Sequence, residues 1–255
     1  MSGAPRLELD GLGIDVPGRT LIPAVSGTVQ AGEFIALLGG NGTGKSLLLR
    51  TLAGLHAPAR GQVRIDGEPL PSLARRDIAR RLGFLPQDPD AAPQGVVAES
   101  VLLGRFAHLG LLEAPGAADA ARVQEALARV GIGPLVAREL GTLSGGEQRR
   151  TAIARLLVQA PSIYLLDEPT NHLDPAQQLA VLEHLRALAR GGDIVIASLH
   201  DPNLALRFAD RACLLSGTDA ELLPIASLDA ARLGALYGVD FVETRVGERR
   251  VVVMA

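Results

Sequence analysis

The chain has 255 residues, enough for one large domain or two small ones with a buried core. Its formal net charge of −3 excludes the strongly basic surface that is typical of nucleic-acid binding, so we expect no nucleic-acid partner. The single cysteine, Cys213, lies in the apolar run "RACLLSG", which predicts a reduced core residue in a reducing compartment.

No apolar run approaches the roughly 18 residues that a membrane-spanning helix needs. The longest candidate, "VLLGRFAHLGLL", is interrupted by Arg105 and His108. The first residues, "MSGAPRLELDG", lack the apolar stretch of a signal peptide. We therefore expect a soluble, intracellular protein.

In chain order, short strands with turns are predicted over residues 5–30 and 60–68, as an antiparallel flank. The apolar run 33–39 ends in glycine and precedes a helical stretch, "SLLLRTLAGL". Further apolar runs of strand length end at Pro86 or lie within "SIYLLDE" and "DIVIASLH". Because these runs are apolar on both faces and alternate with helices, they predict an α/β fold around a parallel sheet.

Two later regions depart from this alternation. Residues 88–160 are predicted to be mostly helical, and the tail "FVETRVGERRVVVMA" is predicted to form a hairpin around Gly247-Glu248. We therefore predict a single domain over residues 1–255. Its core and antiparallel flank comprise 1–87 and 161–216, an inserted helical subdomain comprises 88–160, and a C-terminal extension comprises 217–255.

The stretch "GGNGTGKS" fits the phosphate-loop pattern G-x-x-x-x-G-K-[ST] through Gly39, Gly44, Lys45 and Ser46, between a predicted strand and a predicted helix. Glycines let backbone N–H groups surround the phosphates, the lysine reaches the terminal phosphates, and the serine hydroxyl can bind Mg²⁺. Lys45 is the only lysine among 25 basic residues, which indicates a site that needs a compact ammonium group.

Two further stretches carry groups suited to phosphate chemistry. "IYLLDEPT" ends an apolar strand with Asp167 and Glu168, where one carboxylate can hold the Mg²⁺ shell and the other can accept a proton from water. The alternative interpretation is an acidic turn at the end of a strand. "LSGGEQ" opens a predicted helix, whose first backbone N–H groups attract anions. The chain thus has a second anion-binding pattern, although its phosphate loop is already complete.

Taken together, "GGNGTGKS", "LSGGEQ", "LLDEPT", "NHLD" and a histidine after "IVIAS" resemble the ATP-binding cassette (ABC) ATPases, in that family's order, over residues 5–216. The resemblance implies an α/β P-loop ABC ATPase domain with a RecA-like parallel sheet core, an antiparallel β flank and an inserted α-helical subdomain. It also implies that two such domains meet head to tail. The "LSGGEQ" helix of one domain would then hold the γ-phosphate bound by the other, which explains the second anion-binding pattern.

The cofactors that the resemblance implies are ATP and Mg²⁺. The implied ATP-binding residues are Gly39, Gly40, Asn41, Gly42, Thr43, Gly44, Lys45, Ser46 and Leu47 in the phosphate loop, Ser144, Gly145, Gly146 and Glu147 in the signature stretch, and Asp174 in "NHLD".

Catalytic roles are implied for Lys45, Gln87, Glu168 and His200, with Glu168 as the general base and His200 as a contact of the γ-phosphate. The implied Mg²⁺ ligands are Ser46, Gln87 and Asp167. Without the resemblance, Gln87 would be interpreted as a polar residue in a proline-bracketed loop. One position departs from the family, because Val16 stands where an adenine-stacking aromatic residue is expected.

One set of motifs implies that the chain pairs with a second copy of itself or with a relative. The resemblance favours an ATPase subunit of a membrane transporter, peripheral at the cytoplasmic face of the inner membrane and bound to integral-membrane permease subunits. "VVAESVLLGRFAHLG" and "LHDPNLALRFADRACLL" resemble subunits that serve vitamin B12, haem and ferric-siderophore importers, which also use a substrate-binding protein. Two alternatives stay open: a soluble scaffold such as the iron–sulfur assembly ABC ATPase, and an export ATPase.

Overall fold

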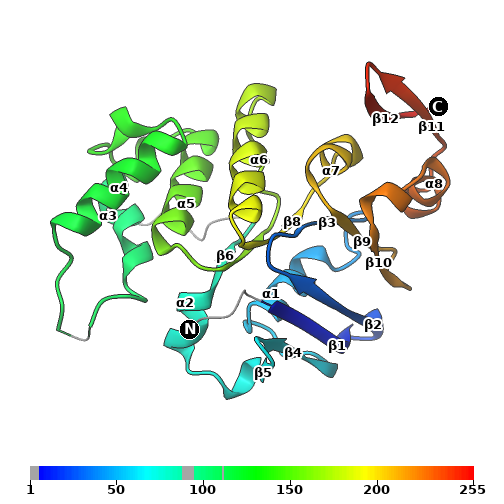
Figure 1. Cartoon of the computed structure of the whole chain (residues 1–255), viewed down its shortest axis with the longest axis horizontal. Helices are drawn as coiled ribbons and strands as arrows, with labels where there is room; N and C mark the ends of the chain where they lie inside the picture. Colours follow the sequence, from blue (N-terminus) through cyan, green and yellow to red (C-terminus); the bar gives the residue numbers. More distant parts are fainter. Residues whose placement is uncertain (1–5, 88–94, 111) are drawn as a thin grey trace.

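The computed structural model describes residues 6–87, 95–110 and 112–255. Its centre is a six-stranded sheet of order β10-β9-β3-β8-β7-β6, in which only the edge strand β10 pairs antiparallel (Figure 1). The strands are β3 (Phe34–Leu38), β6 (Leu82–Leu85), β7 (Ile163–Leu166), β8 (Ile194–Ser198), β9 (Arg211–Leu215) and β10 (Ala220–Pro224). The α/β prediction is confirmed, and β3, β7 and β8 are buried along their whole length.

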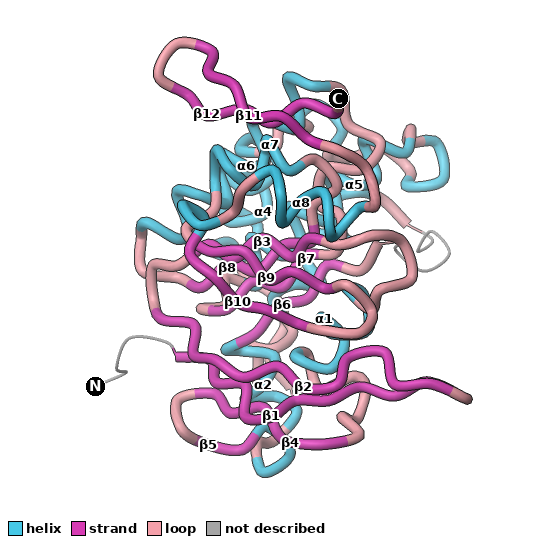
Figure 2. The backbone as a smooth tube through the Cα atoms, turned by 90° about the vertical axis from the view of Figure 1, so that its right-hand side faces the viewer, coloured by secondary structure: helices cyan, strands magenta, loops and turns pink. Residues whose placement is uncertain are grey.

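Different layers cover the two faces of this sheet (Figure 2). Helices α6 (Pro175–Arg190) and α7 (Pro202–Phe208) lie on one face, and α1 (Lys45–Leu52) lies on the other. Side chains alternate along a strand, so each strand contributes to both layers. In β3, Phe34, Ala36 and Leu38 pack with α6 and α7, whereas Ile35 and Leu37 pack with α1.

The antiparallel flank is a second, four-stranded sheet. Its order is β2-β1-β4-β5, and its strands are β1 (Arg6–Val16), β2 (Arg19–Gln30), β4 (Arg60–Ile65) and β5 (Glu68–Pro69). Its apolar side chains, which include Leu7, Ile14 and Ile65, join α1 in one core cluster. The short helix α2 (Arg75–Arg81) then leads into β6.

Three helices form a separate group at one side of the molecule (Figure 1). They are α3 (Val97–Leu102), α4 (Ala117–Arg129) and α5 (Gly145–Gln159). A third core cluster joins them, through residues such as Val101, Leu127 and Val158. The predicted start of the helical subdomain, residue 88, lies outside the described residues. No helix in the described part of the chain combines the length and apolar character that a bilayer span needs.

The end of the chain packs back onto the core. The predicted break after residue 216 falls between β9 and β10, which pair along their whole length, and Leu223 of β10 joins the core cluster beside α6 and α7. Residues 220–224 therefore belong to the central sheet rather than to an extension. Helix α8 (Ala230–Tyr237) follows, and then β11 (Phe241–Val246) and β12 (Arg249–Met254) form the hairpin predicted around Gly247.

Candidate nucleotide site

The phosphate loop joins the end of β3 to the start of α1, and two of its glycines are required by the backbone. Gly39 has a φ of 155° and Gly44 a φ of 103°, both in the region that favours glycine. A Cβ at Gly39 would lie 2.3 Å from the carbonyl oxygen of Leu215, and a Cβ at Gly44 would lie 2.9 Å from Leu21. The loop can therefore keep this close path only with glycine at both positions.

The start of α1 is open to an anion. No side chain caps this helix, so the first-turn N–H groups are left for another partner. The Thr43 hydroxyl donates to the Gly40 carbonyl over 2.9 Å and closes the loop on itself. This arrangement is a backbone cradle of the kind that holds phosphate oxygens.

Lys45 lies folded over this cradle and is only 6% exposed. Its Nζ donates to the carbonyl oxygens of Gly39, over 2.7 Å, and Gly40, over 3.0 Å. Burial lowers the pKa of Lys45, while the charges of Glu168 and Asp167 act in the opposite direction. The ammonium group is thus held by neutral carbonyls, which a phosphate could replace as its partner.

Asp167 and Glu168 follow β7 and form the opposite side of the site; they are 2% and 8% exposed. Ser198, at the end of the neighbouring strand β8, links the two residues. Its hydroxyl donates to Asp167 Oδ1 and accepts the Glu168 backbone N–H, both over 2.7 Å. Because parallel neighbours end at the same edge of the sheet, these groups meet there although they are about 30 residues apart.

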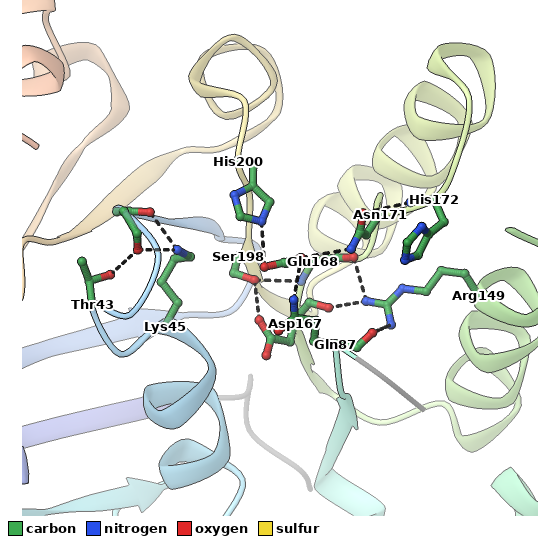
Figure 3. A network of polar contacts seen from close by, with 12 residues as sticks. Thr43, Lys45, Gln87, Arg149, Asp167, Glu168, Asn171, His172, Ser198 and His200 are labelled. Atoms are coloured by element: carbon green, nitrogen blue, oxygen red, sulfur yellow. Dashed lines mark hydrogen bonds and ion pairs between the residues drawn. The ribbon is translucent and has the colours of Figure 1, made fainter. Parts of the chain in front are cut away.

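Three polar side chains surround the Glu168 carboxylate (Figure 3). Gln87 Nε2 donates to Oε2 over 3.1 Å, and Asn171 Nδ2 donates to the same oxygen over 3.2 Å. His200 Nε2 lies 2.7 Å from Oε1. Glu168 also has a φ of 49°, an unfavourable value for a non-glycine residue of the kind found at functional sites.

Arg149 of α5 connects this edge of the sheet to the helical group. Its guanidinium is 3% exposed and donates to the backbone carbonyl oxygens of Asp167, Glu168 and Gln87 (Figure 3). It therefore holds together the chain segments that carry both carboxylates and the glutamine. The sequence interpretation missed Arg149, Ser198 and Asn171; the available signal for Arg149 was its position directly after "LSGGEQ".

A cavity of about 590 Å³ lies between the two sides of the site. It brings together many of the predicted residues, and its lining is Leu21, Asn41, Gly42, Gly44, Lys45, Ser46, Leu47, Gln87, Glu168, Asn171 and His200. None of these lining residues is Phe, Tyr or Trp, and Val16 is not among them. Leu21 is the apolar residue from the antiparallel sheet that borders the cavity.

The signature stretch and Asp174 lie outside this lining. Ser144 caps α5 by accepting the Glu147 N–H over 3.3 Å, and Glu147 Oε2 accepts the Ser144 N–H over 2.8 Å. Asp174 caps α6 by accepting the Gln177 N–H over 2.9 Å. A Cβ at Gly146 would lie 3.1 Å from the His172 carbonyl oxygen, so the signature and "NHLD" stretches are neighbours. The structure thus places the predicted second anion site away from the chain's own cavity.

The oxygen groups at the site suit a small divalent cation. Ser46 and Gln87 line the cavity, and the Asp167 carboxylate lies next to Glu168, which also lines it. Within the described residues no three His, Cys, Asp or Glu side chains gather as a metal site. Mg²⁺ is usually held by one or two carboxylates together with substrate phosphates, so this sparse set of donors fits it.

A family model described as "ABC transporter" matches residues 22–171. The chain belongs to the ABC transporter family. It is an ABC-type, ATP-binding ATPase subunit, and the predicted ABC ATPase fold is confirmed.

Curated relatives and solved structures cover most of the chain. It is 42% identical to the hemin import ATP-binding protein of Rhodopseudomonas palustris, over 85% of this chain and 81% of that protein. It is 38% identical to the achromobactin transport ATP-binding protein of Dickeya dadantii, over 87% of this chain and 84% of that protein. A metal-chelate type ABC transporter in an inward-facing conformation matches with a TM-score of 0.84 and 27% identity, over 98% of this chain and 97% of that one.

A third relative is longer than this chain. The cobalamin import ATP-binding protein of Halobacterium salinarum is 36% identical over 82% of this chain, but the match spans only 52% of that protein. The chain therefore covers about half the length of this relative.

Proposed function

We propose that the chain hydrolyses ATP at this cavity with Glu168 as the general base. The observation that carries the proposal is that Glu168 and Lys45 line the same cavity, with the carboxylate held by Gln87, Asn171 and His200. Lys45 and the phosphate-loop N–H groups would bind the phosphates. Glu168 would accept a proton from the attacking water, and His200 would contact the γ-phosphate.

Ser46, Gln87 and Asp167 would hold Mg²⁺ beside the β- and γ-phosphates. The bound cation supplies positive charge that neutralises the phosphate oxygens as the γ-phosphoryl group is transferred. The chain's own part is to keep these oxygen donors in place. Ser198 does so for Asp167 through the 2.7 Å hydrogen bond to Oδ1.

A second copy of the chain would complete the site head to tail. Ser144, Gly145, Gly146 and Glu147 lie outside the chain's own cavity, and Ser144 and Glu147 are exposed or partly exposed at the start of α5. This helix start would meet the γ-phosphate held by the partner copy, and Asp174 would couple the two sites. ATP would favour the closed dimer and ADP the open one, which gives the cycle a mechanical output.

A permease subunit would bind beside α2. Arg76 and Arg80 of α2 both donate to the Ala107 carbonyl oxygen, over 3.1 and 2.8 Å, and so tie α2 to the segment that follows α3. Exposed apolar residues border this junction, with Leu55 at 63% and Phe106 at 60%. A surface of this kind suits a short amphipathic helix from a membrane protein.

The cargo would be an iron chelate, such as haem or a siderophore, or vitamin B12, because the relatives named for hemin, achromobactin and cobalamin transport share 36–42% identity with the chain. The chain would then act in import, together with a substrate-binding protein, at the cytoplasmic face of the inner membrane. A soluble scaffold or an export ATPase would use the same ATP chemistry with a different partner.

Glu168→Gln tests the chemistry. Because the amide cannot accept the proton but keeps the shape of the side chain, we expect ATP binding within a few-fold of wild type and turnover lower by about 10²–10⁴-fold. With ATP and Mg²⁺ present, the variant is expected to accumulate as a nucleotide-bound dimer in size-exclusion chromatography. Turnover within a few-fold of wild type would show that Glu168 is not the base.

The partner is tested with the same variant. Tagged Glu168→Gln is expressed in its own host, the membranes are solubilised with ATP and Mg²⁺, and the co-purifying proteins are identified. A polytopic membrane protein is expected, and compounds that stimulate hydrolysis in the reconstituted complex then identify the cargo. Recovery of soluble assembly proteins alone would favour the scaffold and would leave the ATP chemistry unchanged.

A further inference from the structure

The segment after β10 is firmly attached to the ATPase core. Leu228, Leu233 and Val252 are 0–2% exposed and belong to the core cluster that contains β3, α6 and α7. Figure 1 shows α8 and the β11–β12 hairpin next to α7. A two-stranded hairpin is only marginally stable by itself, so its position depends on these contacts.

The hairpin meets α7 through a pair of hydrogen bonds as well as through the apolar contacts of Val252. Asn203 Nδ2 donates to the Val252 carbonyl oxygen over 3.0 Å, and the Val252 N–H donates to Asn203 Oδ1 over 2.8 Å. The amide of Asn203 therefore pairs with the free edge of β12 as another strand would. The backbone N–H and C=O of the buried residue Val252 are thus both satisfied by Asn203.

Asn203 lies in the first turn of α7, directly after the segment that carries His200. The Asp201 side chain accepts the Asn203 N–H over 2.8 Å, so the turn between His200 and Asn203 is closed by a local hydrogen bond. His200 is itself about half exposed, and among the described residues its ring is held by the 2.7 Å contact with Glu168. The position of the His200 backbone therefore depends on where α7 begins.

We propose that residues 225–255 are a positioning element of the ATP site, in which the Asn203–Val252 pair sets the start of α7 and thereby the place of His200. The inference rests on the proposed role of His200 at the γ-phosphate. Asn203 is a positioning residue in this arrangement, because it is not among the residues that line the cavity. The phosphate loop itself does not depend on the pair.

The test compares Asn203→Leu with a matched control, Arg250→Met. Arg250 also makes two hydrogen bonds from β12, to the carbonyl oxygens of Ile225 and Ala226, but neither reaches α7. Both variants are expected to lower the melting temperature. Only Asn203→Leu is expected to lower kcat, by about ten- to hundredfold relative to wild type. Its KM for ATP is expected to stay within about twofold of the wild-type value. Equal kcat losses in both variants would show that the Asn203–Val252 hydrogen bonds only stabilise the fold. That result would overturn the proposal.

A double-mutant cycle with His200→Ala shows whether Asn203 acts through the histidine. In that background, Asn203→Leu is expected to cause little further loss of kcat, because the side chain that it positions is gone. A full, additive loss would overturn the inference. If His200→Ala alone keeps wild-type turnover, the proposed role of His200 is wrong.

A spectroscopic readout separates these two failures. The chain has five histidines, so the His200 imidazole signal can be assigned by its absence in His200→Ala. Asn203→Leu is expected to shift that signal and leave the His56 signal in place, whereas Arg250→Met is expected to shift neither. An unshifted His200 signal in Asn203→Leu would overturn the proposal whatever His200 does in catalysis.

Discussion

The starts of α1 and α5 use the same local device, a helix N-terminus behind a glycine-containing turn, in opposite ways. At α1 no side chain caps the helix, and Lys45 supplies a positive charge beside the open N–H groups. At α5 the Ser144 hydroxyl and the Glu147 carboxylate satisfy the backbone, and this carboxylate already places a negative charge at the helix start. The Ser144 cap takes up the Glu147 N–H in this first turn, so the α5 start by itself attracts an anion less strongly than the α1 start does.

The surroundings of the two starts differ as well. Lys45 is 6% exposed inside the cavity, whereas Ser144 is exposed at the surface. Burial strengthens the attraction between a helix start and a phosphate, and water weakens it. The α5 start would attract a phosphate as strongly as the α1 start only when another surface encloses it. For this reason we propose that it serves the site of a second copy of the chain.

Lys45→Ala and Ser144→Arg are expected to be the most damaging changes, and each is expected to lower turnover by more than about a hundredfold by itself. The first removes the phosphate lysine, and the second fills the α5 start with a bulky cation. In an equimolar mixture half of the dimers are mixed, and one of their two sites is intact. The mixture is therefore expected to recover about a quarter of wild-type turnover.

Ser144→Thr is the control for this experiment, because it keeps the hydroxyl cap, and it is expected to remain active. Steady-state phosphate release from the separate and mixed proteins provides the measurement. If no ratio of the two inactive proteins restores turnover, the two helix starts do not serve one shared site.

Arg149→Met is expected to have the next largest effect, on the attachment of α5 to the sheet. It removes the guanidinium donor from the carbonyl oxygens of Asp167, Glu168 and Gln87, although the Glu168 oxygen still accepts the Asn171 N–H, and we expect a loss of about 3 kcal/mol in the free energy of unfolding. The matched control is Arg150→Met, whose side chain bonds, within the described part of the chain, to Gly146 of its own helix. Urea unfolding measures the free energy of unfolding of both variants. Equal losses in the two would mean that the hydrogen bonds of Arg149 to the buried carbonyl oxygens do not stabilise the fold.

The smallest effect concerns the charge at the α5 start. The Ser144 backbone N–H, followed by the Ser144 hydroxyl, lowers the pKa of Glu147. A carboxylate with a lowered native pKa stabilises the fold above its ordinary pKa of about 4.3, and that stability is lost as the pH falls through the native pKa. The melting temperature of Glu147→Gln is thus expected to lie below that of wild type at pH 7 and to converge with it as the pH falls through the native pKa. A constant difference across this range would exclude the charge as the cause.

The sequence predicted those parts of the molecule that depend on local pattern. The runs at β3, β7 and β8 are apolar on both faces, and such runs fit only a sheet covered on both sides. The phosphate loop was recognisable because its glycines and Lys45 are adjacent in the chain. The hairpin of β11 and β12 follows from its turn at Gly247 and the alternation around it.

The parts that the sequence did not predict depend on contacts between distant segments. Ser198 is the last residue of an apolar strand, and nothing beside it shows that Asp167 and Glu168 will lie within 2.7 Å. Two arginines, Arg149 and Arg150, follow "LSGGEQ". Only the folded chain shows that Arg149 is the buried one. Strand β10 is different, because it forms a hairpin with its chain neighbour β9 through the short turn 216–219. The glycine in this turn, Gly217, is a local signal that the assignment to an extension overlooks.

The rarity of lysine gives the molecule an unusual chemical profile. Lys45 is the only side-chain amine in the chain, and it lies inside the nucleotide cavity. Enzymes that modify lysine would find no other side-chain amine to react with, because the 24 remaining basic residues are arginines. Any lysine-directed modification of this protein would therefore report directly on whether its phosphate loop is free or filled.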